Sequence, residues 1–248
     1  MHAYALEWRK LRGKRVLLTA ALMTVAEALF VSLNLLAQHA QGHTLTWGYL
    51  LSPFGMFNGL FFPAMLAVCA SRLADMEHEG GLRLTRLCGQ TTSCLWDGKM
   101  GVLLAIALCA VGLQVGVALL IGKAIGMPHP PDAGMLLRFV SGTLMVSLPA
   151  AVIPLFLALW FENQLVALAE GMLAALIGFI SNLLPSPLRN LLLYGNYAEL
   201  VTAAPQEVRP GCYEVLDTPI RMLPLALTLL AGIALYALAR SQVAQREC

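Results

Sequence analysis

The sequence predicts an all-α integral membrane protein with six transmembrane helices, an N-terminal amphipathic interfacial helix and a cytoplasmic coupling helix. Hydrophobic residues make up 58% of the 248 residues and charged residues only 12%, and the mean hydropathy is +0.73. A soluble domain carries about 25% charged residues, so this chain lacks the polar surface that water requires. Six apolar runs are each long enough to cross a bilayer, since roughly 20 helical residues span the hydrocarbon core.

The six runs occupy most of the chain, which we therefore treat as one transmembrane domain. They lie near residues 16–37, 49–70, 101–121, 135–160, 165–184 and 221–238. The first run is longer than the apolar core of a secretory signal peptide, so we interpret it as a retained helix. With both termini placed in the cytoplasm, 11 of the 16 Lys and Arg residues fall on the cytoplasmic side. This bias predicts that orientation.

The segment before the first span, residues 1–15, has the pattern of a helix that lies on the membrane surface. Tyr4, Trp8 and Leu11 share one helical face, and Lys and Arg residues occupy much of the remainder. An aromatic and apolar face beside basic residues suits the interface between lipid headgroups and water. The alternative interpretation is a frayed basic tail.

The longest predicted cytoplasmic loop covers residues 71–99 and holds 8 of the chain's 30 charged residues. Gly80 and Gly81 should end any helix there, because glycine is conformationally permissive. We expect a short coupling helix from Leu82 to about Cys88 to follow. Loops with this much organisation commonly bind a partner, and the alternative is a plain solvated turn.

The largest predicted external element is the loop of residues 185–220. Leucines at 188 and 191–193 favour either an amphipathic helix or a re-entrant hairpin, and a polar stretch with two prolines follows. This loop is the first candidate for contact with a partner or a substrate. By contrast, residues 38–48 between the first two spans are too few to form a folded extracellular domain.

Two carboxylates interrupt the apolar runs: Glu27 in the first span and Glu170 in the fifth. A charge near the bilayer centre costs at least about 2.5 kcal/mol, so such side chains should face protein or water. Asn34 follows Glu27 by seven residues on the same side of the helix, which predicts a polar stripe. We expect these three residues to line a transport path; the alternative is structural hydrogen bonding between helices. Small residues at 171–178 also predict close packing, within the chain or across a dimer seam.

Several motifs that would indicate other functions are missing from the sequence. No GxxxxGK[ST] phosphate loop, HExxH helix or GxSxG turn occurs. Cys88 and Cys94 are spaced unlike zinc ligands and have no histidine close by. A net charge of +2 without a recognisable nucleic-acid motif does not indicate nucleic-acid binding. We therefore expect no catalytic residues, no metal site and no nucleic-acid partner.

Three short stretches and the overall layout carry a family resemblance. The stretches are LEWRKLR at residues 6–12, DMEHEGGL at 75–82 and WDGK at 96–99. Together with six spans, a charged loop after the second span and an enlarged loop after the fifth, they resemble the permease subunit of an ABC transporter of the ABC-2 type. Within that family, the length of the chain is similar to that of the lantibiotic-immunity permeases.

The resemblance implies a division of labour between subunits in a bacterial cytoplasmic membrane. A dimer of separate ATP-binding subunits would bind ATP and Mg²⁺, whereas this chain would bind no cofactor and would not be an enzyme. A second permease copy or a paralogue would complete a path that expels a lantibiotic or similar peptide from the membrane lipid. The ATP-binding subunit would contact five charged residues: Asp75, Glu77, Glu79, Arg83 and Arg86. Export of small drugs or lipids is the alternative within the family, and a non-transporting membrane anchor or regulator is the alternative class.

Overall fold

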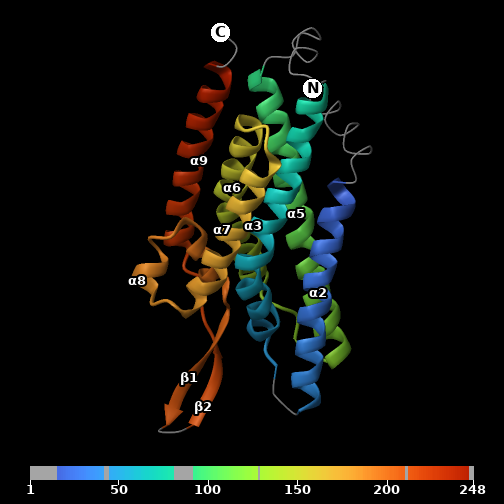
Figure 1. Cartoon of the computed structure of the whole chain (residues 1–248). Coiled ribbons are helices and arrows are strands. Elements are labelled where there is room, and N and C mark those ends of the chain that lie inside the picture. The colour runs from blue at the N-terminus through green and yellow to red at the C-terminus, as the bar shows by residue number, and fades with distance from the viewer. Residues whose placement is uncertain (1–15, 42–44, 81–91, 128, 210–211, 246–248) are drawn as a thin grey trace.

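The computed structural model describes residues 16–41, 45–80, 92–127, 129–209 and 212–245. Six of its helices are long and apolar enough to cross a membrane, as the sequence predicts. They are α2 (Val16–Ala40), α3 (Trp47–Gly80), α5 (Thr92–Ile125), α6 (Ala133–Trp160), α7 (Gln164–Ile180) and α9 (Met222–Gln245). These helices run side by side in one bundle (Figure 1), which confirms the predicted helical membrane architecture.

The two ends of the bundle differ. At one end, which we name the terminal end, α2 begins and α9 ends (Figure 1). The last turns of α3 and the first turns of α5 lie at the same end. The opposite end carries a two-stranded hairpin, and we name it the hairpin end. Because six helices cross the bundle in succession, the start of α2 and the end of α9 lie at the same end.

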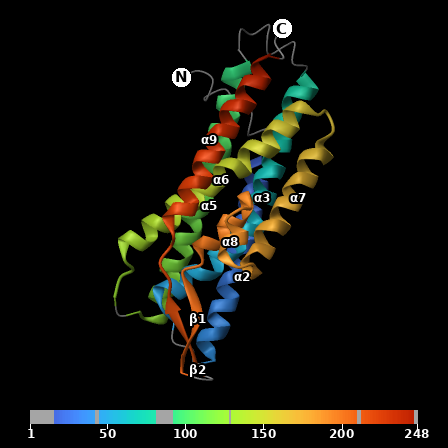
Figure 2. The ribbon, with the colours of Figure 1, turned by 90° about the vertical axis from the view of Figure 1, so that its left-hand side faces the viewer.

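α3 and α6 form the centre of the bundle. In the most apolar stretch of each, 67% of the residues are buried, against 22% in α9. α3 packs against α2, α5, α6 and α7, and α9 lies along α6 (Figure 2). The outward faces of α2, α7 and α9 expose large apolar side chains such as Leu33, Leu173 and Leu230. Such faces suit contact with lipid tails or with a partner helix.

Two helices extend well beyond the predicted spans. α3 continues to Gly80, at the double glycine that was expected to end a helix, and α5 already begins at Thr92. Within the segment expected as a loop, 71–99, residues 71–80 and 92–99 are therefore helical. Leu73 is buried in the core, so packing stabilises α3 beyond the predicted span. Each of these helices has 34 residues and a length of about 51 Å, against about 30 Å for the hydrocarbon core. The predicted coupling helix at 82–88 and the interfacial helix at 1–15 lie outside the described residues.

Local sequence features account for where helices begin and how they continue. The Asp132 carboxylate caps α6 by accepting hydrogen bonds from the backbone N–H groups of Gly134 and Met135, each at 3.1 Å. The Asn163 side chain caps α7 by accepting one from Leu165 N at 2.9 Å. Prolines inside α3 and α6 do not end these helices. In membrane helices, neighbouring helices or water can satisfy the backbone groups that a proline frees.

α3 and α7 approach each other so closely that glycine is required at the contact. A Cβ atom added at Gly178 would lie 2.3 Å from the carbonyl oxygen of Gly59, and one added at Gly59 would lie 2.7 Å from that of Gly178. A Cβ atom at Gly171 would lie 2.1 Å from Ala67 Cβ. The small-residue face of the fifth span therefore packs within the chain, and the alternative of a dimer seam at this face is wrong.

The predicted external loop contains several short elements. They are η1 (Ser181–Leu183), α8 (Ser186–Arg189), η2 (Leu193–Leu200), β1 (Ala203–Arg209) and β2 (Cys212–Asp217). β1 and β2 pair antiparallel, with Ala203 opposite Asp217, and form the hairpin that extends away from the bundle (Figure 1). The sequence analysis did not predict these strands, because a proline and mixed polar residues occupy them and residues of high strand propensity are few.

η2 is a re-entrant segment that lies between α3, α6, α7 and α9. Every residue from Tyr194 to Leu200 is buried. A Cβ atom at Gly55 of α3 would lie 2.3 Å from the Leu200 carbonyl oxygen, so η2 reaches the backbone of the central helix. The leucines on which the two predicted forms of this loop rest lie mostly before η2, and Leu188 and Leu191 are exposed, so neither form is confirmed for them.

Candidate functional site

Three polar side chains from three helices meet in the buried centre of the bundle. Glu27 of α2, Asn58 of α3 and Gln114 of α5 are each 0% exposed. The Nε2 group of Gln114 donates hydrogen bonds to Glu27 Oε2 at 3.0 Å and to Asn58 Oδ1 at 2.7 Å. We name these three residues the central cluster. One amide group thus joins α2, α3 and α5 about halfway along α2.

The central cluster has hydrogen-bonding capacity that it does not use within the described part of the chain. Glu27 Oε1, Asn58 Nδ2 and Gln114 Oε1 have no hydrogen-bond partner there, and Glu27 forms no ion pair with a described Lys or Arg. A buried polar group left unpaired destabilises the folded state by about 1–3 kcal/mol, so each such group in a native protein requires an explanation. One donor and two acceptors are available here to water or to a polar group of a ligand.

The re-entrant segment brings a residue of the loop between α7 and α9 close to the central cluster. Tyr197 of η2 is fully buried, and its hydroxyl lies 3.1 Å from Ser147 Oγ of α6. The ring centroid of Tyr197 lies 6.1 Å from that of Phe62, which follows Asn58 by about one turn of α3. The loop between α7 and α9 therefore reaches the polar centre of the bundle.

Glu170 occupies a separate, half-buried position on α7. The Tyr194 hydroxyl of η2 donates a hydrogen bond to Glu170 Oε1, and Glu170 Oε2 has no partner among the described residues. Glu170 thus holds the beginning of the re-entrant segment and takes no part in the hydrogen bonds of the central cluster.

Asn34 does not join the central cluster. It is exposed, and its Oδ1 accepts a hydrogen bond of 2.6 Å from Gln38 Nε2 on the same helix. Seven residues advance a helix by about 10.5 Å and also shift the position around its axis. The polar stripe predicted to face another helix is therefore wrong at Asn34. A transport path along Glu27, Asn34 and Glu170 stays a prediction.

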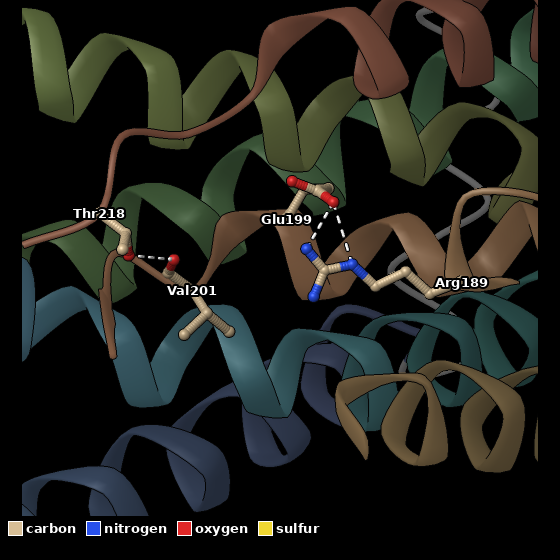
Figure 3. A network of polar contacts seen from close by, with 4 residues as sticks. All are labelled: Arg189, Glu199, Val201 and Thr218. Atoms are coloured by element: carbon tan, nitrogen blue, oxygen red, sulfur yellow. Dashed lines mark hydrogen bonds and ion pairs between the residues drawn. The ribbon is translucent and has the colours of Figure 1, made fainter. Parts of the chain in front are cut away.

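An ion pair holds the re-entrant segment in place (Figure 3). Arg189 Nε and Nη2 both donate to Glu199 Oε1, at 3.0 and 2.5 Å, and the Glu199 side chain is only 3% exposed. Nearby, the Thr218 hydroxyl donates to the Val201 carbonyl oxygen at 3.3 Å, which joins the two ends of the hairpin. Sequence reasoning missed this pair, because both residues lie in a loop that it considered only for contact with a partner or a substrate.

At the terminal end, the first turns of α5 are joined to α3 and α9. Lys99 is 0% exposed, and its Nζ donates to the Leu73 carbonyl oxygen of α3 at 2.8 Å. The Asp97 carboxylate accepts hydrogen bonds from the Arg240 guanidinium of α9 at 2.9 and 3.1 Å, and another from the Tyr236 hydroxyl. The WDGK stretch therefore anchors helices to one another, although its charged residues were expected in a cytoplasmic loop.

The residues predicted to contact an ATP-binding subunit lie at or beyond the last turns of α3. Asp75 is half-buried on α3. Glu77 and Glu79 belong to the final turns of α3, but their side chains lie outside what the structure describes. Arg83 and Arg86 lie outside the described residues altogether, so this contact stays a prediction.

Comparison with known families decides the class of protein. The model of the ABC-2 family transporter protein matches residues 4–182, which contain α2, α3, α5, α6 and α7 and so the whole central cluster. The chain belongs to the ABC-2 transporter family. No curated protein and no solved structure matches it.

Membership of the ABC-2 family gives the central cluster a context. The chain is a membrane-spanning permease subunit, a component of a transporter that works with an ABC ATP-binding subunit. The part of this ABC-2 permease after residue 182 lies outside the family match and contains η2, the hairpin and α9. The match therefore covers the central cluster but not the ion pair of Arg189 and Glu199.

Sequence reasoning singled out Glu27 but missed both of its neighbours in the central cluster. Asn58 and Gln114 are single amides inside apolar runs, and an uncharged amide stands out less than a carboxylate in a hydropathy profile. The signal was present nonetheless, since a strongly polar side chain within a membrane span commonly bonds another helix. A search of each span for amides as well as charges finds both.

Proposed function

We propose that this ABC-2 permease works with an ATP-binding subunit to expel a lantibiotic, or a similar membrane-active peptide, from the cytoplasmic membrane. The observation that carries the proposal is an apolar groove between α2 and α5, with a cavity volume of about 250 Å³. Small residues such as Ala21 and Ala105 line it together with larger apolar ones. Leu17, Val25 and Leu113 border the groove and are exposed, so it opens toward lipid.

This groove leads toward the central cluster. Thr24 and Ala110 line it, and Glu27 and Gln114 follow about one turn further along α2 and α5. Apolar walls with a polar centre close by fit an amphipathic molecule whose polar group approaches Glu27. A membrane-active peptide has this character and already lies in the bilayer. The similarity in length and layout to lantibiotic-immunity permeases supports a peptide of that class.

The energy for export would come from the partner subunits. ATP and Mg²⁺ would bind to a dimer of ATP-binding subunits in the cytoplasm, and a second permease copy or a paralogue would complete the path. We place the contact with the ATP-binding subunit at five charged residues: Asp75, Glu77, Glu79, Arg83 and Arg86. Lys99 and Asp97 would carry movement from that end into the bundle, because they join α5 to α3 and α9.

Export of small drugs or lipids is a second candidate function, and the size of the groove favours it. A cavity of about 250 Å³ encloses much of a small amphiphile but only part of a peptide. A membrane anchor that moves nothing is the alternative of a different class, and it predicts no protection that depends on ATP.

Tolerance measurements in a sensitive bacterium separate these functions. The host would express the chain with the ATP-binding subunit that co-purifies with it in mild detergent. We expect the minimum inhibitory concentration of a lantibiotic to rise several-fold, and Ala21→Trp, which fills the groove, to abolish the rise. Ala26→Trp is the matched control, because Ala26 is exposed on the same helix and does not line the groove. Tolerance to small drugs alone would indicate the second candidate, and no tolerance despite co-purification would indicate an anchor.

A further inference from the structure

On another side of α5, two hollows adjoin between α5, α6 and α9. Their cavity volumes are about 470 and 400 Å³, and Leu104 of α5 and Leu148 of α6 line both. On α9, Leu229 lines the first hollow and Ile233 lines the second, about one helical turn further on. We name the two hollows together the α9 groove.

The packing of α9 explains why the α9 groove is open. α9 presses against α6, since a Cβ atom added at Gly232 would lie 2.8 Å from Pro149 Cδ. The hydrogen bonds from α9 to α5 among the described residues lie at the terminal end, where Arg240 and Tyr236 bond Asp97. Away from that end, α9 follows α6 and leaves a gap beside α5.

The walls of the α9 groove are mostly apolar and face the bilayer. Leu108 is 51% exposed and Ile233 is 49% exposed, while the small residues Gly101 and Ser141 leave room inside. From Asp97 to Leu108 the groove follows twelve residues of α5, which span about 16 Å along a helix. That length is close to half of the roughly 30 Å hydrocarbon core, so the α9 groove has the depth of one lipid leaflet.

The mouth of the α9 groove carries charges of both signs. Arg240 Nε and Nη2 donate to the Asp97 carboxylate, and the two side chains remain 46% and 30% exposed. The guanidinium group has five N–H donors, so a phosphate can also bind to an arginine that is already paired with a carboxylate. Tyr236 lines the same mouth, and tyrosine is common at the depth of lipid headgroups.

We propose that the α9 groove binds one glycerophospholipid from the leaflet at the terminal end, with an acyl chain along Leu104 and Leu148 and the phosphate on Arg240. Two properties of the α9 groove point to this occupant. Its length corresponds to one lipid leaflet, and Arg240 at its mouth can bind a phosphate headgroup. The lipid supplies contacts that α9, with its low burial, lacks beside α5. The site opens between α5, α6 and α9 rather than between α2 and α5, with Ala105 of α5 bordering both grooves, and it does not depend on the exported substrate.

Native mass spectrometry of the full chain in mild detergent tests the headgroup contact. The probes are phosphatidylglycerol, phosphatidylethanolamine and a diacylglycerol with the same acyl chains. We expect a one-to-one adduct with each phospholipid and about tenfold weaker binding of the diacylglycerol, which lacks a phosphate for Arg240. Arg240→Gln should lower phospholipid binding to the level of the diacylglycerol, whereas Arg240→Lys should keep most of it.

Filling the groove tests the position of the acyl chain. Gly101→Trp and Ser141→Trp narrow the α9 groove from two different helices. Gly112→Trp is the matched control on α5, because a Cβ atom there would meet nothing within 4 Å and Gly112 does not line the groove.

We expect the adduct to be lost in Gly101→Trp and Ser141→Trp and kept in Gly112→Trp, each measured on protein that elutes as a single peak. Two filling variants are used so that one still decides if the other misfolds, and the Arg240 series is independent of both. Equal lipid binding by all three tryptophan variants, equal binding of the diacylglycerol, or a dimer of the chain in place of a lipid adduct would overturn the proposal.

Discussion

Two buried carboxylates of this ABC-2 permease are satisfied in opposite ways. Glu199 of the re-entrant segment is 5% exposed and pairs with Arg189. Glu27 of α2 is 0% exposed, bonds the neutral amide of Gln114 and keeps one oxygen without a partner among the described residues. Arg189 neutralises the Glu199 carboxylate where the chain folds back, which is a structural role. Glu27 has no such cation among the described residues, and a carboxylate of this kind within a membrane span is a candidate functional residue. The family match covers Glu27 and ends before Arg189, which agrees with this division.

Removing Arg189 should have the largest effect, because it leaves the Glu199 carboxylate buried without a cation. Arg189→Ala should lower the free energy of unfolding by about 3–5 kcal/mol, measured by thermal unfolding in detergent. The double variant Arg189→Ala with Glu199→Ala removes the orphaned charge and should regain part of the loss. If the double variant lost as much as the two single variants added together, the residues would not be coupled and the comparison would fail.

Glu27 should matter less for stability and more for transport. Glu27→Ala should cost about 1–3 kcal/mol, because the buried Gln114 amide loses an acceptor. Glu27→Gln keeps the shape of the side chain and should leave the unfolding midpoint close to that of the unaltered protein. ATP-dependent transport should nevertheless fall in Glu27→Gln. Normal transport by a stable Glu27→Gln protein would show that the Glu27 carboxylate is not needed for transport.

Tyr197 connects the two regions, because it belongs to the re-entrant segment and packs against Phe62, about one turn of α3 from Asn58 of the central cluster. Tyr197→Phe removes the contact of its hydroxyl with Ser147 and keeps the ring. We expect a loss of about 0.5–1.5 kcal/mol in the free energy of unfolding, as for an ordinary hydrogen bond. A loss several times larger would mean that the hydroxyl holds more of the bundle together than this one contact.

Asn34 should have the smallest effect, since it is exposed and bonds only Gln38 of its own helix. Asn34→Ala should change the free energy of unfolding by no more than about 0.5 kcal/mol. Measured beside Glu27→Gln, it separates the two residues that the sequence placed on one stripe. A fall in transport by Asn34→Ala at unchanged stability would return Asn34 to the transport path.

Hydropathy was enough to predict the main elements. The six spans follow from long apolar runs, whereas the helix end predicted at Gly80 and Gly81 stays a prediction, because residues 81–91 lie outside the described residues. Glu27 could be singled out because a charge within an apolar run is rare. These features are local, so one stretch of sequence contains the whole signal.

The remaining features depend on contacts between distant residues. Gln114 lies 87 positions after Glu27, and no local pattern shows that the two side chains meet. The segment LYGNYAEL of η2 mixes apolar and polar residues, so its burial comes from the helices around it. Lys99 was expected in a loop because it is charged, but the Leu73 carbonyl oxygen accepts its hydrogen bond inside the bundle. Packing between helices therefore buries Lys99 although its side chain is charged.

Gly59 and Gly178 leave α3 and α7 no room to slide. A shift of either helix by one residue along its axis would drive a side chain into the facing carbonyl group, and the contact of Gly171 with Ala67 opposes rolling in the same way. We therefore expect the two helices to move together as one unit. Relative motion within the chain is then expected at helices such as α2 and α9, whose outer faces are exposed.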